Sequence, residues 1–384
     1  PPAVPLPRFT VEEQREAGVS TGDGSVKEKL VIIGNGMAPG RALEKLFETD
    51  PDRYEVVIFN AEPRVNYDRI MLSPVLSGEK SFDDIVIHGD AWYIQHGITL
   101  YKGCKVETID RVNKTVSSVN GITESYDRLV IATGSVPFII PVPGANLAGV
   151  VTYRDLDDVN TMMIAAKSKG RAVVIGGGLL GLEAAAGLNE QGMDVTVVHV
   201  QPTLMERQLD PAAGYLLGES MKARGIKVMT SANTRQILGD KRVTGVEFAD
   251  GSTIPADLVV MAVGIRPNVA LAKTAELAVN RGIVVDAQMR TSDASIYALG
   301  ECVEVNGATF GLVAPLYDMA NVLAAQLCGD DKATFTPVAT ATRLKVTGVN
   351  LYSAGDFAEG DDREEIVLRD ASAGVYKRLI LKDD

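Results

Sequence analysis

The chain has 384 residues, a formal net charge of −12 and 46% hydrophobic residues. This length exceeds one ordinary core and predicts two or three domains, and the hydrophobic content excludes an intrinsically disordered protein. The negative charge serves solubility and disfavours nucleic acid or an anionic membrane surface as a partner. No apolar run approaches the ~20 residues that a membrane-spanning helix needs, so we expect no membrane partner either.

The N-terminal stretch 1–28 is rich in Pro, Gly, Glu and Ser and has no basic-then-apolar signal pattern. We interpret it as an extension outside the core. Cys104, Cys302 and Cys328 lie far apart, and the sequence has no C-x-x-C pair. A disulfide framework or a zinc site is therefore not expected, and we predict no metal site and a cytoplasmic location.

The first predicted unit is a strand, a glycine turn, a helix and a second strand. Residues 30–33 form a continuous apolar run, which favours a strand buried on both faces. A helix is predicted over 41–48, where apolar residues have helical spacing, and a second strand over 54–59. This order is typical of the β-turn-α-β unit that starts a doubly wound sheet.

The same order restarts at Arg171. A strand over 172–175, three glycines over 176–178, an apolar helix over 179–190 and a strand over 194–200 follow one another. The repetition predicts a second copy of the nucleotide-binding unit. We interpret the Pro- and Gly-rich stretch 139–149 between the copies as a linker.

The rest of the chain completes the second copy and then changes character. A strand over 257–263 closes the second unit, and the stretch 282–298 returns to strand character. A helix over 317–327 follows Pro315, a residue favoured at helix starts. From Phe335 onward, short strand-like runs alternate with Gly-Asp turns and predict the beginning of a third domain; they cover 343–346, 366–368 and 376–381.

The second glycine turn is the stronger nucleotide-binding signal. A turn of this kind exposes backbone N–H groups and points a helix dipole at them, which favours a pyrophosphate. The stretch 176–181 has all three motif glycines, with a buried strand before it and a helix after it. The alternative is a purely structural tight turn. At the end of the next strand, where an acid selects NAD, the chain has His199. The preference between NADH and NADPH stays open, since His199 is equally a candidate half-buried strand residue.

The first glycine turn, 34–40, departs from the pattern because Pro39 occupies the third glycine position. Proline is tolerated in the first turn of a helix, at the cost of looser packing between helix and strand. Glu62, after the second strand, is placed to accept hydrogen bonds from ribose hydroxyls. It lies somewhat beyond the usual ~20 residues from the turn, and its alternative reading is a solvated loop charge.

Seven segments carry a resemblance to a known family, namely 31–38, 66–78, 82–85, 132–135, 204–210, 264–268 and 344–348. With them, residues 29–357 resemble the FAD- and NAD(P)H-dependent pyridine nucleotide-disulfide oxidoreductase family. The segments 66–78 and 204–210 are similar to its nitrite reductase group in particular. The resemblance implies an α/β protein with two Rossmann-like dinucleotide-binding domains of the glutathione-reductase type and a partial C-terminal α+β segment. The implied boundaries are 29–150 with 280–330 for FAD, 151–279 for NAD(P)H and 331–384 for a truncated interface domain.

The resemblance also implies site residues. Glu301, where the family has Asp, would bind the ribityl hydroxyls of FAD, and Arg69 would be the cation near the flavin. Glu183 would sit near the nicotinamide, its alternative being a charge in the first turn of a helix. We expect Glu183 and Arg69 to be catalytic. The full FAD set is Gly34, Gly36, Met37, Ala38, Glu62, Arg69, Val106, Ala132, Thr133, Gly134, Gly300, Glu301, Leu312, Val313 and Pro315. The NAD(P)H set is Gly176, Gly178, Leu179, Leu180, Gly181, Glu183, His199 and Gly264.

One departure from the family is informative. Disulfide- and peroxide-reducing members carry a redox Cys at the position of Pro74, and some carrier-protein reductases carry a Lys there. Cys302 belongs to the segment implied to bind the ribityl chain, and Cys328 ends a helix. We therefore expect electrons to leave the flavin without a cysteine relay, directly to an external one-electron acceptor.

The resemblance implies an FAD-dependent NAD(P)H oxidoreductase that takes hydride from NADH or NADPH. It would deliver electrons to an iron–sulfur and sirohaem centre for nitrite reduction in nitrogen assimilation. The sequence has no four-Cys cluster for an iron–sulfur centre, so that centre is expected on a downstream part or on a partner. The chain would then be a fragment or a standalone electron-transfer subunit, with a homodimer as one possible state. The alternatives are an NADH-dependent reductase of a small electron carrier such as rubredoxin or ferredoxin, and a non-catalytic NADH-sensing flavoprotein.

Overall fold

The computed structural model describes residues 27–338, 340–344, 346, 348–358, 360–370 and 373–382. It divides into two compact units that the chain enters more than once. The first comprises the described residues of 1–68, 86–135 and 267–337, and the second those of 69–85, 136–266 and 338–384. Apart from Lys27 and Glu28, the predicted extension 1–28 lies outside the described residues.

The first unit is built on a parallel five-stranded sheet with the order β21-β9-β1-β2-β5. Its strands are β1 (Glu28–Ile33), β2 (Tyr54–Asn60), β5 (Thr99–Lys102), β9 (Arg128–Ile131) and β21 (Ile296–Ala298). Ile33 pairs with both Phe59 and Ile131, and Ile131 pairs with Ala298. The carboxyl ends of four neighbouring strands therefore reach the same edge, which is where doubly wound sheets bind ligands.

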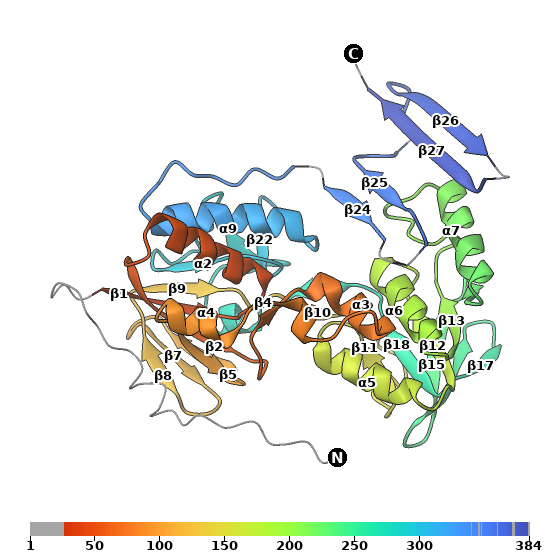
Figure 1. Cartoon of the computed structure of the whole chain (residues 1–384), viewed down its shortest axis with the longest axis horizontal. Coiled ribbons are helices and arrows are strands. Elements are labelled where there is room, and N and C mark those ends of the chain that lie inside the picture. The colour runs from red at the N-terminus through yellow and green to blue at the C-terminus, as the bar shows by residue number, and fades with distance from the viewer. Residues whose placement is uncertain are drawn as a thin grey trace. The chain divides into compact units, whose positions relative to one another are not determined.

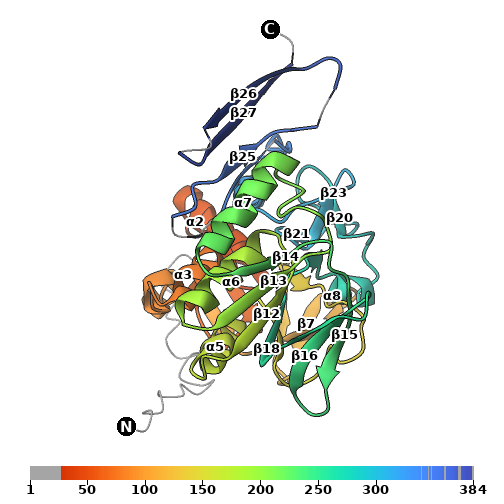
Figure 2. The ribbon, with the colours of Figure 1, turned by 90° about the vertical axis from the view of Figure 1, so that its right-hand side faces the viewer.

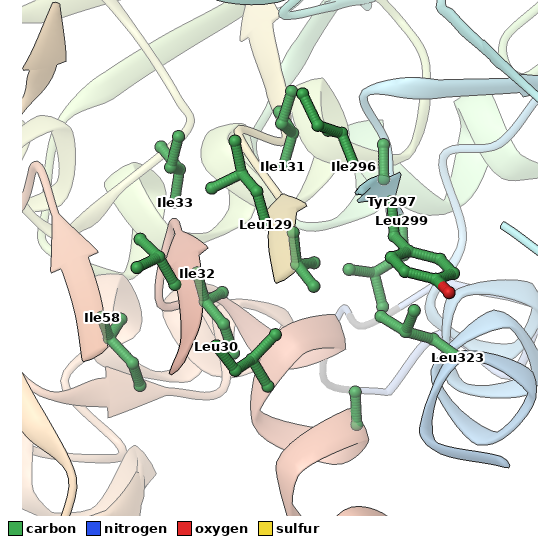
Figure 3. Packing of buried hydrophobic residues seen from close by; sticks show 14 of the residues in the cluster. Leu30, Ile32, Ile33, Ile58, Leu129, Ile131, Ile296, Tyr297, Leu299 and Leu323 are labelled. Carbon is green, nitrogen blue, oxygen red and sulfur yellow. The ribbon is translucent and has the colours of Figure 1, made fainter. Parts of the chain in front are cut away.

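Two helices, α2 (Met37–Thr49) and α9 (Val313–Leu327), pack together over this sheet (Figure 1). Figure 3 shows Leu30 and Leu129 of the strands and Leu323 of α9 in the shared core, and all three are at most 1% exposed. Both helices begin before their predicted starts. The reason is the same in each helix, because a proline lies in the first turn. Backbone N–H groups of a first turn have no partner within the helix, so the N–H that proline lacks costs no helical hydrogen bond and the helix can begin before it.

The other elements of the first unit are short. A small antiparallel sheet, β6-β7-β8, adds Val106, Ile109 and Val116 to the same core. These elements are β3 (Asn66–Tyr67), β4 (Val86–His88), α4 (Asp90–Gln95), β6 (Val106–Asp110), β7 (Thr115–Ser118), β8 (Thr123–Ser125), α8 (Ala270–Thr274), β20 (Ile283–Val285), β22 (Val303–Val305) and β23 (Ala308–Thr309). The strand predicted over 282–298 is thus two separate strands, β20 and β21.

The second unit repeats the architecture with a parallel sheet of order β11-β18-β12-β13-β14 (Figure 2). Its strands are β11 (Val150–Thr152), β12 (Arg171–Ile175), β13 (Asp194–Val198), β14 (Lys227–Met229) and β18 (Leu258–Met261). Its helices are α5 (Leu156–Ala166), α6 (Leu179–Glu190) and α7 (Pro211–Ala223). The helix predicted over 179–190 is confirmed, and Ile175 pairs with both Val198 and Met261, so this sheet also aligns its carboxyl ends.

The segment 69–85 belongs to the second unit, although the sequence analysis placed it with the FAD domain. It contains the short helices η1 (Arg69–Met71) and η2 (Asp83–Ile85) and the helix α3 (Leu72–Ser77), which packs on α5 and α6. The Gln191 side chain donates to the carbonyls of Leu76 and Ser77, at 3.1 and 3.0 Å. A Cβ on Gly187 would lie 2.8 Å from Leu76. These contacts join residues far apart in sequence, which is why no local pattern signalled them.

Two further boundaries differ from the prediction. The stretch 139–149 is not a free linker, because Ile140, Val142 and Leu147 pack on the core of the second unit. The core there includes the antiparallel sheet β15 (Thr234–Gly239), β16 (Val243–Phe248) and β17 (Thr253–Pro255). The first unit also resumes at residue 267 rather than at 280.

The described C-terminal residues form two hairpins within the second unit rather than a unit of their own. They are β24 (Ala341–Arg343) with β25 (Tyr352–Ala354), and β26 (Glu364–Asp370) with β27 (Val375–Leu381). The Ser353 hydroxyl donates to the carbonyl of Gln208. The carboxylate of Asp210 accepts hydrogen bonds from the Tyr376 hydroxyl and the Arg378 guanidinium, and it also caps α7.

The ion pair between Asp257 and Arg171 closes the start of β12 and should make the second unit sensitive to acid. Hydrogen bonds from the Arg171 side chain and backbone N–H lower the pKa of Asp257 to about 2. A lowered pKa in the folded state means that this stabilisation is present above the ordinary pKa of the carboxyl and is lost as pH falls towards 2. We expect Asp257→Asn to cost less than about 1 kcal/mol of unfolding free energy at pH 6, because the pair is exposed.

Urea unfolding of both proteins between pH 6 and 2.5 checks this expectation. The difference between wild type and variant should shrink as the pH falls. A difference that is constant over this range would contradict it.

Candidate functional site

The turn after β1 is held by backbone contacts that admit only glycine. The Gly34 N–H donates to the carbonyl of Phe59 at 2.8 Å, and Gly34 has a φ of +112°. A Cβ on Gly34 would lie 2.2 Å from the carbonyl oxygen of Ala132. The strand ends β1, β2 and β9 therefore meet at this residue with no room for a side chain.

Gly36 differs, because its missing Cβ faces open space. A Cβ there would meet no atom within 4 Å, and Gly36 is the N-cap of α2 without a side-chain hydrogen bond. No acidic residue lies in the first turn of α2, which begins at Met37 and continues through Ala38. The first N–H groups of the helix are thus left for a ligand, and the helix dipole favours an anionic one.

Pro39 does not loosen the packing of α2 as expected, because Gly40 supplies the close approach one residue later. A Cβ on Gly40 would lie 2.5 Å from the side-chain nitrogen of Asn66. That nitrogen donates to the carbonyl of Gly36 at 2.7 Å. Asn66 therefore fixes the turn from the side, and Pro39 is buried in the first helical turn.

Glu62 lies just beyond the end of β2 and is only 18% exposed at its side chain. Its Oε2 accepts hydrogen bonds from the Tyr67 hydroxyl at 2.8 Å and from Arg64 at 3.3 Å. Its carbonyl accepts from the N–H of Gly103, so the chain leading to Val106 passes beside it. Glu62 is thus a positioned carboxylate, and the alternative of a solvated loop charge is wrong.

The predicted FAD residues that follow β9 and β21 lie at the same edge of the first sheet. The Thr133 hydroxyl donates to the carbonyl of Asn268 at 2.7 Å, and the Asn268 N–H donates to the carbonyl of Gly134 at 2.9 Å. The Ser135 hydroxyl donates to Glu301 at 2.7 Å.

Gly300, which precedes Glu301, has a φ of +90° and a Cβ position 3.5 Å from that of Ala38. Glu301 therefore follows a residue that approaches the start of α2. Leu312 is the N-cap of α9, again without a side-chain hydrogen bond, ahead of Val313 and the buried Pro315.

The turn after β12 in the second unit repeats the first in detail. The Gly176 N–H donates to the carbonyl of Val198 at 2.8 Å, and its φ is +122°. A Cβ on Gly176 would lie 2.2 Å from the carbonyl oxygen of Ala262, and one on Gly181 only 1.9 Å from that of Gly176. Gly178 is the N-cap of α6 with nothing within 4 Å of its Cβ position. Leu179 and Leu180 begin the helix, and Leu180 is 40% exposed.

Other helices in the second unit show what an ordinary N-terminus looks like here. Asp155 caps α5 by accepting from the N–H of Asp158, and Asp210 caps α7 by accepting from that of Ala213. The helices after the two glycine turns have no such cap. Lack of a side-chain cap is not confined to these two helices, because α3 and α9 also begin without one. What distinguishes α2 and α6 from α3 and α9 is that each begins at a glycine whose Cβ position is open.

His199 and Gly264 complete the edge of the second sheet. His199 is 8% exposed, and its Nδ1 accepts from the N–H of Gly177 while Nε2 contacts Glu206. It is therefore a buried residue that supports the turn. Gly264 has a φ of +113°, and its carbonyl accepts from the N–H of Phe138.

Glu183 lies in α6 beyond the first turn, so its reading as a first-turn charge is wrong. It is 8% exposed, and Oε2 accepts a hydrogen bond from the Ser73 hydroxyl at 2.5 Å. Ser73 in turn lies 2.9 Å from the Tyr153 hydroxyl. Burial raises the pKa of Tyr153, so it stays protonated and can donate along this chain. A cavity of about 290 Å³ is lined by Ser73, Pro74 and Glu183, among others.

The predicted cation and the three cysteines fall in different units. Arg69 precedes α3 in the second unit and donates to the carbonyl of Arg154 at 3.1 Å. Cys104, Cys302 and Cys328 all belong to the first unit. Burial raises the pKa of Cys302 to about 11, and that of Cys328 is raised as well. Neither of these two thiols is a ready thiolate at neutral pH.

In the described part of the chain, no group of three or more His, Cys, Asp or Glu residues is arranged to hold a metal ion. Within the same residues, no helix combines the length and apolarity that crossing a bilayer requires.

Comparison with known families matches residues 28–326 to the pyridine nucleotide-disulphide oxidoreductase model. The chain belongs to this family. A second model, the C-terminal domain of rubredoxin NAD+ reductase, matches residues 341–384. Family membership makes the chain an NAD(P)H-dependent flavoprotein oxidoreductase that binds FAD and NAD(P)H.

Three relatives illustrate the match. Nitrite reductase (NAD(P)H) of Bacillus subtilis is 48% identical over 93% of this chain and 44% of its own length. The assimilatory nitrate reductase electron transfer subunit of the same organism is 44% identical over 93% of this chain and 46% of its own length. The crystal structure of the ferredoxin reductase for the CYP199A2 system of Rhodopseudomonas palustris is 28% identical, with a TM-score of 0.84 over 93% of this chain and 89% of that one. The chain thus spans less than half the length of these two curated relatives.

The residues present fit the two nucleotides. Each unit offers an uncapped helix N-terminus beside a glycine whose Cβ position is open, and the first adds the positioned carboxylate of Glu62. Sequence reasoning missed Ser73 and Tyr153, because their partners are distant in the sequence, and it missed Glu206, which bonds His199 only seven residues away. Asn66, Ser73 and Glu206 all lie inside segments that the resemblance had already singled out, and this was the signal that could have been followed further.

Gly36 and Gly34 form a matched pair for testing the first turn. We expect Gly36→Ala to fold and to lose most of its flavin, because its methyl group would point into the open space beside the helix N-terminus. Gly34→Ala should destabilise the fold itself by more than about 2 kcal/mol, because of its positive φ and the contact with Ala132.

Flavin content per chain and thermal unfolding of the flavin-free proteins separate the two effects. Retention of flavin by a well-folded Gly36→Ala protein would show that the open space is not the binding site.

Ser73→Ala should slow flavin reduction by NADH about tenfold, because Glu183 loses the hydrogen bond that positions it. Ser77→Ala is the control, since Ser77 is in the same helix and its hydroxyl donates only to the carbonyl of Pro74. Stopped-flow flavin bleaching with each variant measures the effect. Equal rates in the two variants would argue against a positioning role for Ser73.

Proposed function

We propose that this chain is the reductase part of an NAD(P)H-dependent nitrite-reducing system. In this role it accepts reducing equivalents from NADH or NADPH and delivers electrons to an iron–sulfur and sirohaem centre. That centre lies on another part of a longer protein or on a partner. The bound flavin supplies the conversion between hydride chemistry and single-electron transfer.

The observation that carries the proposal is the residue at position 74. Members of the family that reduce disulfides place a redox thiol there, and this chain has a proline. The preceding Ser73 is buried and its hydroxyl is bonded to Glu183. Cys104, Cys302 and Cys328 all belong to the first unit, whereas α3 belongs to the second. α3 therefore carries no thiol that could pass electrons to a disulfide substrate.

The named relatives support the same acceptor class. One is a nitrite reductase, and another is an electron transfer subunit of an assimilatory nitrate reductase. Both are considerably longer than the matched region, which leaves room in them for further redox centres. The homodimer and the cytoplasmic location expected from the sequence stay predictions.

The chain's own residues have separate tasks in this proposal. Gly36 and Gly178 leave the helix N-termini open for the two pyrophosphates. Glu183, held by Ser73, orients the nicotinamide ring, and the Tyr153 hydroxyl supports Ser73 from behind. Arg69, whose guanidinium donates to the carbonyl of Arg154, would be the positive charge that stabilises a reduced, negatively charged flavin.

One observation favours a second candidate, a reductase of a small electron carrier. Residues 341–384 match the C-terminal domain of rubredoxin NAD+ reductase, so the last part of the chain is shared with carrier-protein reductases. Such an enzyme uses the same nucleotide sites and differs only in the protein that accepts the electrons.

Anaerobic titration of the FAD-loaded chain with NADH and NADPH tests the shared step. We expect full bleaching of the flavin absorbance with about one equivalent of the preferred nucleotide, since the chain provides both binding sites. Glu183→Gln should slow this bleaching roughly tenfold or more. Flavin that stays oxidised with both nucleotides would refute the proposal and its rival together, and would favour a sensing role.

Reoxidation of the reduced chain then separates the two candidates. The acceptors to compare are an iron–sulfur and sirohaem nitrite reductase module and a purified rubredoxin. Faster electron transfer to the module supports the proposal, and faster transfer to rubredoxin supports the rival.

A further inference from the structure

His199 stands where dinucleotide-binding units usually carry an acid, at the end of the second strand after the glycine turn. Both of its ring nitrogens are engaged. The N–H of Gly177 lies 3.1 Å from Nδ1, and Glu206 Oε2 lies 2.9 Å from Nε2.

These contacts fix the tautomer of the ring. A backbone N–H can only donate, so Nδ1 of His199 accepts and carries no proton. The ring proton is therefore on Nε2 and is donated to the carboxylate of Glu206. The imidazole is neutral in this arrangement and presents no positive charge to a phosphate. The charged group beside His199 is therefore the carboxylate of Glu206.

A second contact holds Glu206 beside the turn. The N–H of Met205 donates to the carbonyl of Gly177 at 3.0 Å. A Cβ on Gly177 would lie 2.6 Å from Leu204 and 2.8 Å from His199, so the segment is packed directly on the turn. The N–H of Leu209 closes back on the carbonyl of Met205, which makes a tight bend around Glu206.

We propose that Glu206 replaces the missing strand-end acid and makes this enzyme select NADH over NADPH. The inference rests on the proposed function, because it concerns the nucleotide that feeds the flavin. The Glu206 side chain is 35% exposed, so its carboxylate is both anchored and open to a ligand. It would accept a hydrogen bond from the ribose 2′-hydroxyl of NADH, and it would repel the 2′-phosphate of NADPH.

The neighbouring Arg207 is the group that would argue for NADPH. It is exposed, and within the described residues no hydrogen bond or ion pair is assigned to it. Holding a phosphate with such a side chain requires ordering it first, whereas Glu206 is already held by His199. Glu206, rather than Arg207, is therefore the side chain that is already positioned to meet the nucleotide.

Binding of the oxidised nucleotides tests this inference without turnover. Calorimetric titration of the FAD-loaded chain with NAD+ and with NADP+ gives the ratio of the two dissociation constants. We expect NAD+ to bind at least about tenfold more tightly, and Glu206→Gln to reduce that ratio about tenfold, because the amide keeps the hydrogen bond to His199 and removes only the charge.

Asp240→Asn is the matched control, since it removes one negative charge from the exposed turn between β15 and β16. Its ratio should equal that of the wild type. Arg207→Gln should also leave the ratio unchanged.

Three outcomes overturn the inference. They are equal binding of NAD+ and NADP+ by the wild type, an unchanged ratio in a folded Glu206→Gln protein, and a selective loss of NADP+ binding in Arg207→Gln. In all three, flavin bleaching by a nicotinamide nucleotide would still support the proposed function. If neither nucleotide binds and the flavin is not reduced, the proposed function itself fails, and the inference fails with it.

Discussion

Both glycine turns depend on one steric constraint, the carbonyl oxygen that occupies the place of a glycine side chain. Ala132 supplies this oxygen to Gly34, and Ala262 supplies it to Gly176, at the same 2.2 Å from the Cβ position. The contact brings the end of a third strand against the turn between the first strand and its helix. Since only glycine permits it, the constraint fixes where each helix begins and where its N–H groups point.

The same constraint separates the helices that follow the glycine turns from two other helices of the second unit, by how their N-termini are capped. α2 and α6 begin at glycines and lack side-chain caps, while α5 and α7 begin at aspartates that satisfy their own N–H groups. The first pair is incomplete without an anion and the second pair is complete by itself. A pyrophosphate bound at each of these two N-termini would offset the cost of leaving the donors unpaired, and the stability of each unit would then depend on its nucleotide.

The sequence was a good guide wherever the controlling interaction is local. It predicted β1, β12 and the full extent of α6, because buried strands and glycine turns have short-range signatures. It placed the starts of α2 and α9 too late. For α9, the prediction placed Pro315 before the helix, and for α2 the predicted start was residue 41, although Pro39 is compatible with a first helical turn. It could not foresee that Ser73 meets Glu183, because these residues are 110 positions apart and meet only once α3 packs on α6.

The double use of Asp210 has a mechanical consequence. This carboxylate caps α7 through the N–H of Ala213 and at the same time accepts from Tyr376 and Arg378 of the C-terminal hairpin. Burial raises its pKa, but the hydroxyl, amide and guanidinium donors outweigh that effect and leave the pKa lowered. Asp210 also ends the segment that carries Glu206. Any movement of that segment would therefore have to move the hairpin with it or break the hydrogen bonds that Tyr376 and Arg378 donate to Asp210.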